Sequence, residues 1–409
     1  MADTVEDLNA LAKEVFGDQG VKDLVPNQNK IQQEIPFSNK EAYGLKYVET
    51  IRLGYPAGFT HQAADGTSGA FTLNDATSGT RKRIEVQGEQ FILKDQFSYE
   101  DGARISKGGK QAFASFQAEI FEPMQRSMRK RAECQLLYGG MGIGVVSTYT
   151  SGDPSIVIDV AEWAEGIWAG MEGASLQVYD AAGTTARNSG TAVTISSIDL
   201  ENRKITLSGT VSSCVATDIV WWNGAKGEEM SGIHKILTNT GSLFGVSAAT
   251  YTLWKGSEQA VGGSFSFQKL KNGITKAYNL GLDDDLCLFI SPEAWDQLID
   301  TVESLRRTTS GSDIKKLDIG TEELVYHSQN GMTKVIASNF VKKSYGYGLC
   351  KKDWKRIGAA DVTFNTPGMP QEKLFHHLET KAGIEVRAYT NQAIYSKRPA
   401  ASVLFKTIS

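Results

Sequence analysis

The sequence predicts an α+β protein in which a long helix leads into an inserted β domain before the chain returns to mixed helix and strand. Apolar residues recur every four positions between Lys110 and Leu137, which is typical of an amphipathic helix. The segment from about Val145 to Phe265 is instead rich in Gly, Ser, Thr and Val, with short apolar runs between turn residues. Helical and strand patterns alternate again from about Gly273, so one domain interrupts another.

Composition limits the classes of protein to consider. The chain has 409 residues, 41% hydrophobic and 22% charged, which are ordinary proportions for a folded soluble protein. Its formal net charge of −4 gives no basic field that attracts nucleic acid, so we expect any contact with DNA to be local and weak. No apolar run of about 18 residues is available to cross a membrane. The acidic beginning lacks the features of a signal peptide, so we expect folding in a cytoplasm.

The N-terminal residues predict an extended arm followed by a long hairpin. Apart from a short helical pattern over Val5–Phe16, apolar residues are sparse up to about residue 50. Beyond it, alternating segments separated by turn-rich linkers predict a hairpin whose tip buries little apolar surface within one subunit. Its predicted strands are Thr50–Leu53, Ala70–Leu73, Arg83–Val86 and Gln90–Leu93. A basic cluster at this tip, Arg81, Lys82 and Arg83, is either a solvated face or a patch of salt bridges between subunits.

The long helix carries a proline and a second basic cluster. Pro123 predicts a kink or a split, because proline removes one backbone hydrogen bond. The basic side chains that follow repel one another unless acidic groups or phosphate face them. These residues are Arg126, Arg129, Lys130 and Arg131. Part of their charge is balanced by Glu119, Glu122 and Glu133.

A glycine run follows the helix. Its members are Gly139, Gly140, Gly142 and Gly144. A dinucleotide-binding loop would need glycine where Val145 stands, and it would follow a strand instead of a helix. The run therefore predicts a helix stop and a hinge.

The segment after the glycines predicts a small β domain. Its strand patterns are Ser175–Asp180, Thr191–Asp199, Arg203–Gly209 and Thr217–Trp222. The polar turn Asp199–Arg203 makes the middle two a hairpin. Three tryptophans, Trp221, Trp222 and Trp254, either plug the end of a barrel or stack sugars in a binding module.

The C-terminal part predicts a sheet built from distant segments. Leu286–Ile290 is a continuous apolar strand, which favours burial on both faces. Ser291 and Pro292 begin the helix that follows, as N-cap and first helical residue. Further strands are predicted at Glu323–His327, Lys334–Ala337, Tyr345–Cys350 and Ser402–Ile408.

The residue inventory favours no enzyme, metal site or cofactor. No nucleophile elbow and no P-loop motif is present. Asp283, Asp284 and Asp285 fit either a cation site or a solvated turn, and the adjacent His376 and His377 would point to opposite faces of a strand. The four cysteines lack metal-site or redox spacing and are expected to be buried thiols. They are Cys134, Cys214, Cys287 and Cys350.

The order of these parts resembles the major capsid proteins of tailed bacteriophages, which have the Hong Kong 97-like fold. The resemblance covers most of the chain and depends on segment order more than on any single motif. The segments that carry it are Ala132–Gly144, Leu286–Asp300, Lys334–Phe364 and Gly383–Tyr395.

The resemblance implies a division of the chain into six parts. Residues 1–50 are the N-terminal arm, 51–100 the hairpin called the E-loop, and 101–144 the peripheral domain with its spine helix. Residues 145–265 are an inserted β domain that only some members carry. Residues 266–360 form the axial domain, and 361–409 return to the peripheral domain and end the chain.

The resemblance also implies a function. The chain would assemble as hexamers and pentamers into an icosahedral shell around double-stranded DNA, in the virion, after synthesis in the host cytoplasm. Both basic clusters would lie at contacts between subunits. Expected partners are a portal protein, decoration proteins and packaged DNA, bound weakly and without specificity. The arm is too short to contain a scaffolding segment, so we expect a scaffolding protein in trans. The alternative is a carbohydrate-binding or adhesin protein built on the β domain.

Overall fold

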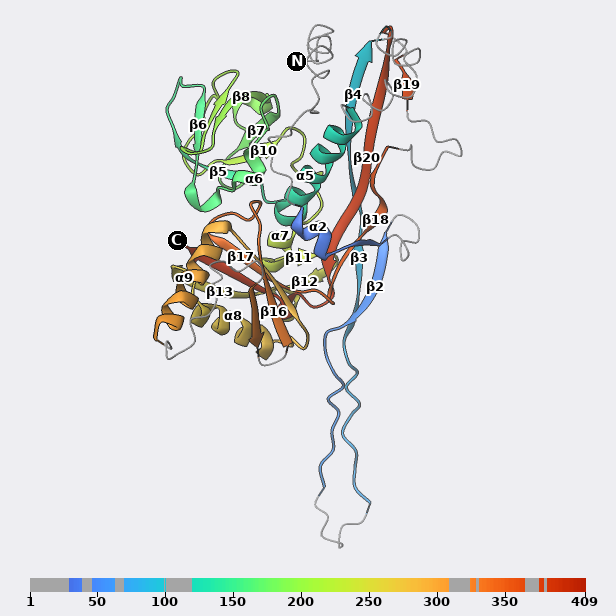
Figure 1. Ribbon diagram of the computed structural model, residues 1–409. Helices are drawn as coiled ribbons and strands as arrows, with labels where there is room; N and C mark the ends of the chain where they lie inside the picture. Colours follow the sequence, from blue (N-terminus) through green and yellow to red (C-terminus); the bar gives the residue numbers. More distant parts are fainter. Residues whose placement is uncertain are drawn as a thin grey trace, which may run out of the picture.

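The computed structural model describes residues 29–38, 46–62, 70–98, 100, 120–308, 324–328, 331–364, 375–378 and 381–409. They form an α+β molecule with two sheets, a closed barrel and a ribbon that projects from the body (Figure 1). The helix predicted at Val5–Phe16 lies outside the described residues. In the part of the chain that is described, no helix is long and apolar enough to cross a membrane.

The first sheet has five strands and is covered by the spine helix. Its members are β1 (Phe37–Ser38), β18 (Trp354–Thr363), β20 (Gly383–Ser396), β19 (Phe375–His377) and β4 (Glu89–Ser98). The long strand β20 pairs with β4 over ten residues on one side and with β18 and β19 on the other. Helix α5 (Glu122–Tyr138) packs Met124 and Met128 against Val386 and Ala388 of β20. The apolar residues that recur every four positions in this part of the sequence therefore form the buried face of α5.

Pro123 is the second residue of α5, and the first turn of a helix is where proline is best tolerated. Ile120 and Phe121 form a π-helical turn directly before it. The helical pattern predicted for residues 110–119 lies outside the described residues. At the other end, Tyr138 is the last residue of α5, so the predicted stop at the glycine run is confirmed.

The second sheet has six strands and two covering helices. In spatial order the strands are β13 (Ser257–Gly263), β21 (Val403–Ile408), β17 (Tyr345–Cys350), β14 (Leu286–Ile290), β16 (Gly331–Ala337) and β15 (Leu324–Ser328). Every residue of β14 is buried, as its unbroken apolar run predicts. The helices are α8 (Phe267–Asn279) and α9 (Pro292–Thr308). The predicted cap of α9 is present, because Ser291 Oγ accepts from Ala294 N at 3.3 Å.

The barrel closes six short antiparallel strands. They are, around the barrel, β10 (Ile219–Trp222), β5 (Gly144–Tyr149), β6 (Ser155–Ile158), β9 (Lys204–Leu207), β8 (Val193–Asp199) and β7 (Ser175–Tyr179). The four strand patterns read from the sequence are all present, and the hairpin at Asp199–Arg203 joins β8 to β9. Strands β5 and β6 were not predicted. The single-turn helices in and after the barrel are η2 (Val160–Glu162), α6 (Glu165–Trp168), η3 (Asn188–Gly190), α7 (Ile233–Leu237) and η4 (Thr252–Trp254).

The segment predicted as an inserted domain, 145–265, contains more than the barrel. After β10, the chain forms a small hairpin of β11 (Ser242–Leu243) and β12 (Val246–Ser247) and then enters the six-stranded sheet as β13. Ser257 of β13 lies opposite Val403 of β21, in parallel register. A partner so distant along the chain leaves no local signal, so the sequence could not separate this part from the barrel.

The hairpin forms a two-stranded ribbon that leaves the body (Figure 1). Strands β2 (Tyr47–Arg52) and β3 (Arg81–Val86) pair in antiparallel register at its base. The strand predicted at Ala70–Leu73 is wrong, because this segment has no ladder partner within the described residues. Strand β4, expected in the hairpin, belongs to the five-stranded sheet, where Phe97 is buried beneath α5.

The described part of the N-terminal arm lies on its own subunit. Helix α2 (Lys30–Glu34) contacts α5, and Ile31 is fully buried in the main core. Strand β1 pairs in parallel with β18. The arm therefore bridges elements that are far apart in sequence.

The three tryptophans offer no ring face to a sugar. Trp221, Trp222 and Trp254 are 5%, 3% and 3% exposed. Trp222 packs in the barrel core, whereas Trp254 packs beneath the ribbon with Ile84. The carbohydrate-binding alternative is therefore without support. All three rings are buried, but the prediction that they plug the end of the barrel is wrong for Trp254, which packs beneath the ribbon.

Candidate assembly surfaces and domain junctions

The first predicted basic cluster lies at the base of the ribbon, so its expected position at the tip is wrong. Arg81, Lys82 and Arg83 lie on β3 and are all exposed. Arg83 has a loose ion pair with Glu85 at 4.0 Å, while Arg81 and Lys82 have none among the described residues. The positive charge of this strand therefore remains largely available to another molecule.

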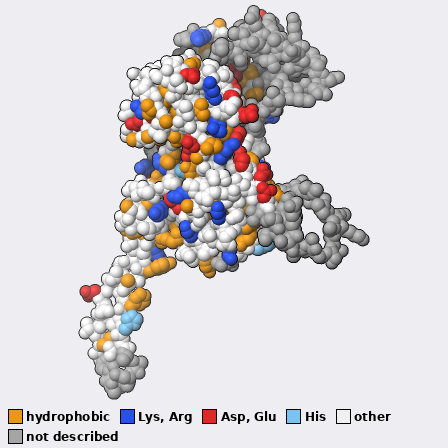
Figure 2. Space-filling model, turned by 90° about the vertical axis from the view of Figure 1, so that its left-hand side faces the viewer, with side chains coloured by type: hydrophobic (Ala, Val, Ile, Leu, Met, Phe, Trp, Pro, Cys, Tyr) orange, Lys and Arg blue, Asp and Glu red, His pale blue; other side chains and the backbone are white. Residues whose placement is uncertain are grey.

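Farther along the ribbon, large apolar side chains face solvent. Tyr55 is 80% exposed and Leu73 is 72% exposed, with Phe59 and Phe71 similarly open. Figure 2 shows hydrophobic side chains along the projecting ribbon, away from the body. Apolar patches of this kind on a folded protein mark contacts with another molecule.

The second basic cluster divides into two pairs. Arg126 and Arg129 are exposed on α5, where Arg126 pairs with Glu122 at 3.7 Å. Lys130 is buried and donates to the carbonyl of Ala169 at the foot of the barrel. Arg131 stacks over the ring of Trp222 at 4.2 Å, and burial lowers its pKa to about 10. Two of the four predicted contact residues thus hold the barrel to the spine within one subunit.

Glu133 does not neutralise this cluster, contrary to the prediction. Its carboxylate is fully buried and accepts from the backbone N–H groups of Ile31 at 2.7 Å and Gln32 at 3.2 Å. Burial raises its pKa to about 7 although these hydrogen bonds oppose the rise. Glu133 therefore attaches the arm to the spine.

The glycine run makes a tight passage from α5 to the barrel. Gly140 and Gly142 have φ of 75° and 86°, which favour glycine. A side chain on Gly139 would lie 2.2 Å from the carbonyl oxygen of Met230, and one on Gly142 would lie 2.4 Å from Ile219 Cγ2. Gly144 begins β5. The glycines are required for close packing, and their role as a hinge stays a prediction.

A buried polar network joins the barrel, the spine and the six-stranded sheet. Lys342 Nζ pairs with Glu162 Oε2 at 2.5 Å, and its backbone N–H donates to Tyr138 Oη at 2.8 Å. Tyr345 Oη donates to Glu162 Oε1 at 2.7 Å. Burial raises the pKa of Glu162, but Lys342 and Tyr345 outweigh it, so the pKa is lowered and the pair is ionic.

His234 of α7 completes this network and makes it sensitive to acid. Its Nδ1 lies 2.9 Å from Tyr347 Oη, and burial, with the nearby Lys342, lowers its pKa to about 4. The folded state therefore holds a neutral imidazole, whereas the unfolded chain takes up a proton below about pH 6.5.

We expect His234 to lower the free energy of unfolding by about 3 kcal/mol as the pH drops from 6.5 to 4, because the unfolded state binds the extra proton. Glu133, with its raised pKa, acts in the opposite direction over this range, so the test compares variants that share Glu133. In urea denaturation, the stability of the unsubstituted chain relative to His234→Gln should fall as the pH drops from 6.5 to 5. Its stability relative to His327→Gln, a substitution at an exposed position of β15, should not change with pH. A difference between the unsubstituted chain and His234→Gln that is independent of pH would contradict the assignment.

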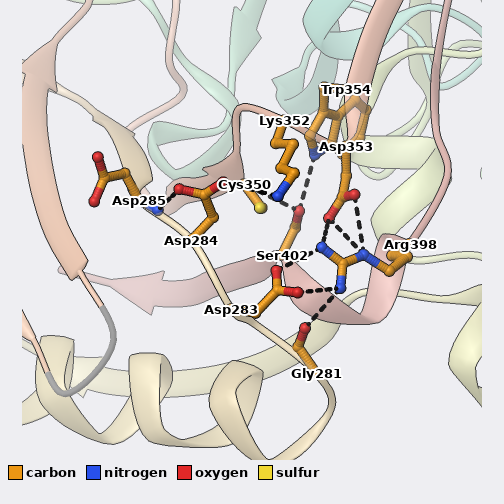
Figure 3. A network of polar contacts seen from close by, with 10 residues as sticks. All are labelled: Gly281, Asp283, Asp284, Asp285, Cys350, Lys352, Asp353, Trp354, Arg398 and Ser402. Atoms are coloured by element: carbon orange, nitrogen blue, oxygen red, sulfur yellow. Dashed lines mark hydrogen bonds and ion pairs between the residues drawn. The ribbon is translucent and has the colours of Figure 1, made fainter.

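A second junction lies where the chain passes between the two sheets (Figure 3). The guanidinium of Arg398 binds Asp353, with Nε to Oδ2 at 2.9 Å, and Asp283, with Nη2 to Oδ1 at 2.6 Å. These two carboxylates raise the pKa of Arg398 although burial opposes them. Beside them, Trp354 Nε1 donates to Ser402 Oγ at 2.8 Å. The crossings from β17 to β18 and from β20 to β21 are thereby held together.

The acidic run is part of this junction and not a cation site. Asp283 binds Arg398, Asp284 pairs with Lys352 at 3.4 Å, and Asp285 accepts from Met332 N at 2.8 Å. No group of three potential metal ligands occurs among the described residues. His376 and His377 lie on β19, and the four cysteines are buried free thiols, as predicted.

Comparisons with known proteins identify the fold. No family model matches the sequence, and no curated protein matches it either. A chain of the cyanophage A-1(L) capsid superposes with a TM-score of 0.55 at 10% identity, over 98% of this chain and 99% of that one.

Two other solved structures are similar at lower scores. The capsid of a native GTA particle has a TM-score of 0.49 at 9% identity, over 98% of both chains. The Mycobacterium phage Adephagia structure has a TM-score of 0.45 at 10% identity, over 97% of both chains. The match over the full length, with the sheets, spine helix and ribbon described above, leads to one conclusion: the chain has the Hong Kong 97-like fold of bacteriophage capsid proteins.

Proposed function

We propose that this chain is a major capsid protein that assembles into an icosahedral shell enclosing double-stranded DNA. The observation that supports this most strongly is the ribbon. It projects from the body with exposed aromatic and aliphatic side chains, and a second copy of the chain is the partner that would bury them. The full-length match to a cyanophage capsid chain supports the same function. The role is structural and non-catalytic.

The subunit would form hexamers and pentamers, in which each ribbon lies on a neighbouring subunit. One such contact is weak, because the ribbon is narrow. The same contact is repeated around a closed shell, where multivalency applies. The assembled shell is therefore far more stable than any single pair of neighbouring subunits.

Three exposed arginines and one lysine would set the register of neighbours. Arg81, Lys82 and Arg83 on the ribbon, with Arg129 on the spine, are exposed and have at most a loose ion pair among the described residues. Charge at such a contact selects orientation more than it adds affinity. Arg126, which pairs with Glu122, would lie at the same contacts.

The remaining partners follow from the proposed role. A scaffolding protein would act in trans, a portal protein would occupy one vertex, and decoration proteins would bind the outer surface. Packaged DNA would be contacted weakly, in keeping with the net charge of −4. Assembly would take place in the host cytoplasm and the chain would reside in the virion.

We also propose that the barrel is a module inserted at the end of the spine, between the peripheral and axial domains. Both of its ends lie near the glycine run, since Val220 of β10 lies opposite Gly144 of β5. Lys130 and Arg131 dock it on α5, so any hinge motion at Gly139–Gly144 would need these contacts to open.

Sedimentation velocity tests the proposed function. The chain, expressed alone or with its scaffolding protein, should sediment as particles of megadalton mass. A chain that stays a monomer or small oligomer at high concentration under both conditions would contradict the proposal.

Reversing the basic cluster should block assembly and leave the fold intact. In the variant Arg81→Glu, Lys82→Glu and Arg83→Glu, complementary contacts become repulsive, so we expect at least a tenfold loss of particles. The matched control is Lys269→Glu, Lys271→Glu and Lys276→Glu on α8, which changes the charge equally. Similar losses in both variants would show that net charge, and not the ribbon, is responsible.

A further inference from the structure

The base of the ribbon packs on the body through one face only. Ile84 and Val86 of β3 are buried with Tyr395 of β20, and the ring of Tyr47 lies 5.2 Å from that of Tyr395. The opposite face of the base is open to solvent. The direction in which the ribbon leaves the body is therefore determined on this one face and along the edge of β3.

Within it, one carboxylate joins the ribbon to the body. Glu49 Oε2 accepts from Tyr395 Oη at 2.8 Å and from Tyr47 Oη at 3.1 Å, and Oε1 pairs with Lys397. Burial raises the pKa of Glu49, but Lys397 and the two tyrosines outweigh it, so the pKa is lowered and the carboxylate is charged. Hydrogen bonds to a charged group are strong and directional.

The cluster also connects to the junction between the sheets. The backbone N–H of Lys397 donates to the carbonyl of Asp353 at 3.0 Å, and the next residue, Arg398, binds the carboxylate of Asp353. Through Lys397, Glu49 thus ties the ribbon to the turn that holds the two sheets together. The pairing of Asp353 with Arg398 in that turn is drawn in Figure 3. On the edge of β3, the ribbon has one further tie, from Glu85 N to the carbonyl of Phe244 at 3.3 Å.

We propose that Glu49, Tyr395 and Lys397 form an elbow lock that fixes the angle between ribbon and body, and with it the curvature of the shell. The second half of this inference rests on the proposed function. Glu49, Tyr395 and Lys397 are positioning residues, since they act on a neighbouring subunit only through the ribbon.

Because the ribbon is long, a small rotation at its base produces a large displacement of its distal part. Between Glu49 and Gln62 the chain advances about 13 residues, or about 40 Å at about 3.3 Å each. A rotation of about 5° at the base then moves the distal part by about 3 to 4 Å, which is enough to break a side-chain contact. Apolar packing at Ile84 and Val86 holds the ribbon in place, but it is less directional than the hydrogen bonds of Glu49.

The lock is tested first in the unassembled subunit. Spin labels on Thr77→Cys of the ribbon and Lys271→Cys of α8 report the distance between ribbon and body by electron–electron double resonance. The native cysteines are all buried, and the chain without added cysteines gives the labelling background. Glu49→Ala should at least double the width of the distance distribution.

Glu85→Ala is the matched control. The Glu85 side chain lies on the open face of the same ribbon and pairs with Lys46 at 3.0 Å. Glu85→Ala removes this pair and keeps the backbone hydrogen bond to Phe244. Its distance distribution should match the unsubstituted chain. If Glu49→Ala does not fold, Tyr395→Phe removes one hydroxyl and keeps the buried ring, and it should also widen the distribution. An unchanged width in Tyr395→Phe and in a folded Glu49→Ala would overturn the lock.

Shell diameter tests whether the elbow lock fixes the curvature of the shell. If the unsubstituted chain forms uniform shells, Tyr395→Phe should give a mixture of diameters by electron microscopy, with thermal stability nearly unchanged. Equally uniform shells would overturn the link to curvature while leaving the proposed function intact. If no chain forms shells, the proposed function fails, whereas the distance distributions still decide whether the lock exists.

Discussion

Deleting residues 53–80 should abolish particle formation and leave a folded subunit. The described residues of this range, 53–62 and 70–80, form the distal ribbon, and their exposed apolar side chains contribute little to any core. Arg52 and Arg81 lie opposite each other in the ladder, so an Asn-Gly turn can join them without changing the register. We expect at least a hundredfold loss of megadalton particles by sedimentation, because every contact between neighbours is weakened at once.

The folded state of the deletion variant is its own control. Its circular dichroism spectrum should keep the full α+β signal, and its free energy of unfolding should change by less than about 1 kcal/mol, since surface substitutions have small effects. Particle formation at the level of the unsubstituted chain would show that the ribbon is dispensable. That result would contradict the assembly role proposed for the ribbon, and it would leave the description of the fold unchanged.

Lys342→Ala should cause a large loss in the free energy of unfolding, much larger than that of Lys343→Ala. Its side chain is 5% exposed and pairs with Glu162, which is 19% exposed. Removing the lysine leaves a buried carboxylate without its cation, so we expect a loss of about 3 to 5 kcal/mol in urea denaturation. Because the pair joins the barrel to the six-stranded sheet, the barrel should also become separable by limited proteolysis.

The neighbouring lysine provides the control. Lys343 pairs with Glu165 and Glu293, both at 2.8 Å, but its side chain is 28% exposed. Lys343→Ala should therefore cost about 1 kcal/mol or less. Lys342→Met combined with Glu162→Gln removes both charges and keeps an acceptor for Tyr345, so it should recover much of the loss. Equal losses in Lys342→Ala and Lys343→Ala would contradict the network.

Elements with a strong local pattern could be predicted from the sequence. The buried strand β14, the cap of α9 and the hairpin of β8 and β9 each depend on neighbours within a few residues, so their signals are complete in a short window. The end of α5 belongs to the same group, because two glycines follow Tyr138 and the second of them, Gly140, has a positive φ.

Contacts across long chain separations could not be predicted. Lys130 and Arg131 look like solvated or intermolecular charges on a helix, and only the folded barrel brings Ala169 and Trp222 to them. The partners of Arg398, at Asp353 and Asp283, are equally distant. A stacked arginine near tryptophan is a frequent arrangement, but the sequence alone gives no reason to select Trp222.

The position of the ribbon in assembled particles tests the central claim most directly. Electron cryomicroscopy of particles purified from cells that express the chain should show closed shells of five- and six-membered rings. In each ring, the ribbon of one subunit should lie on its neighbour, with Tyr55 and Leu73 buried between them. Preparations that hold only single subunits, or shells in which every ribbon folds back on its own body, would contradict the account.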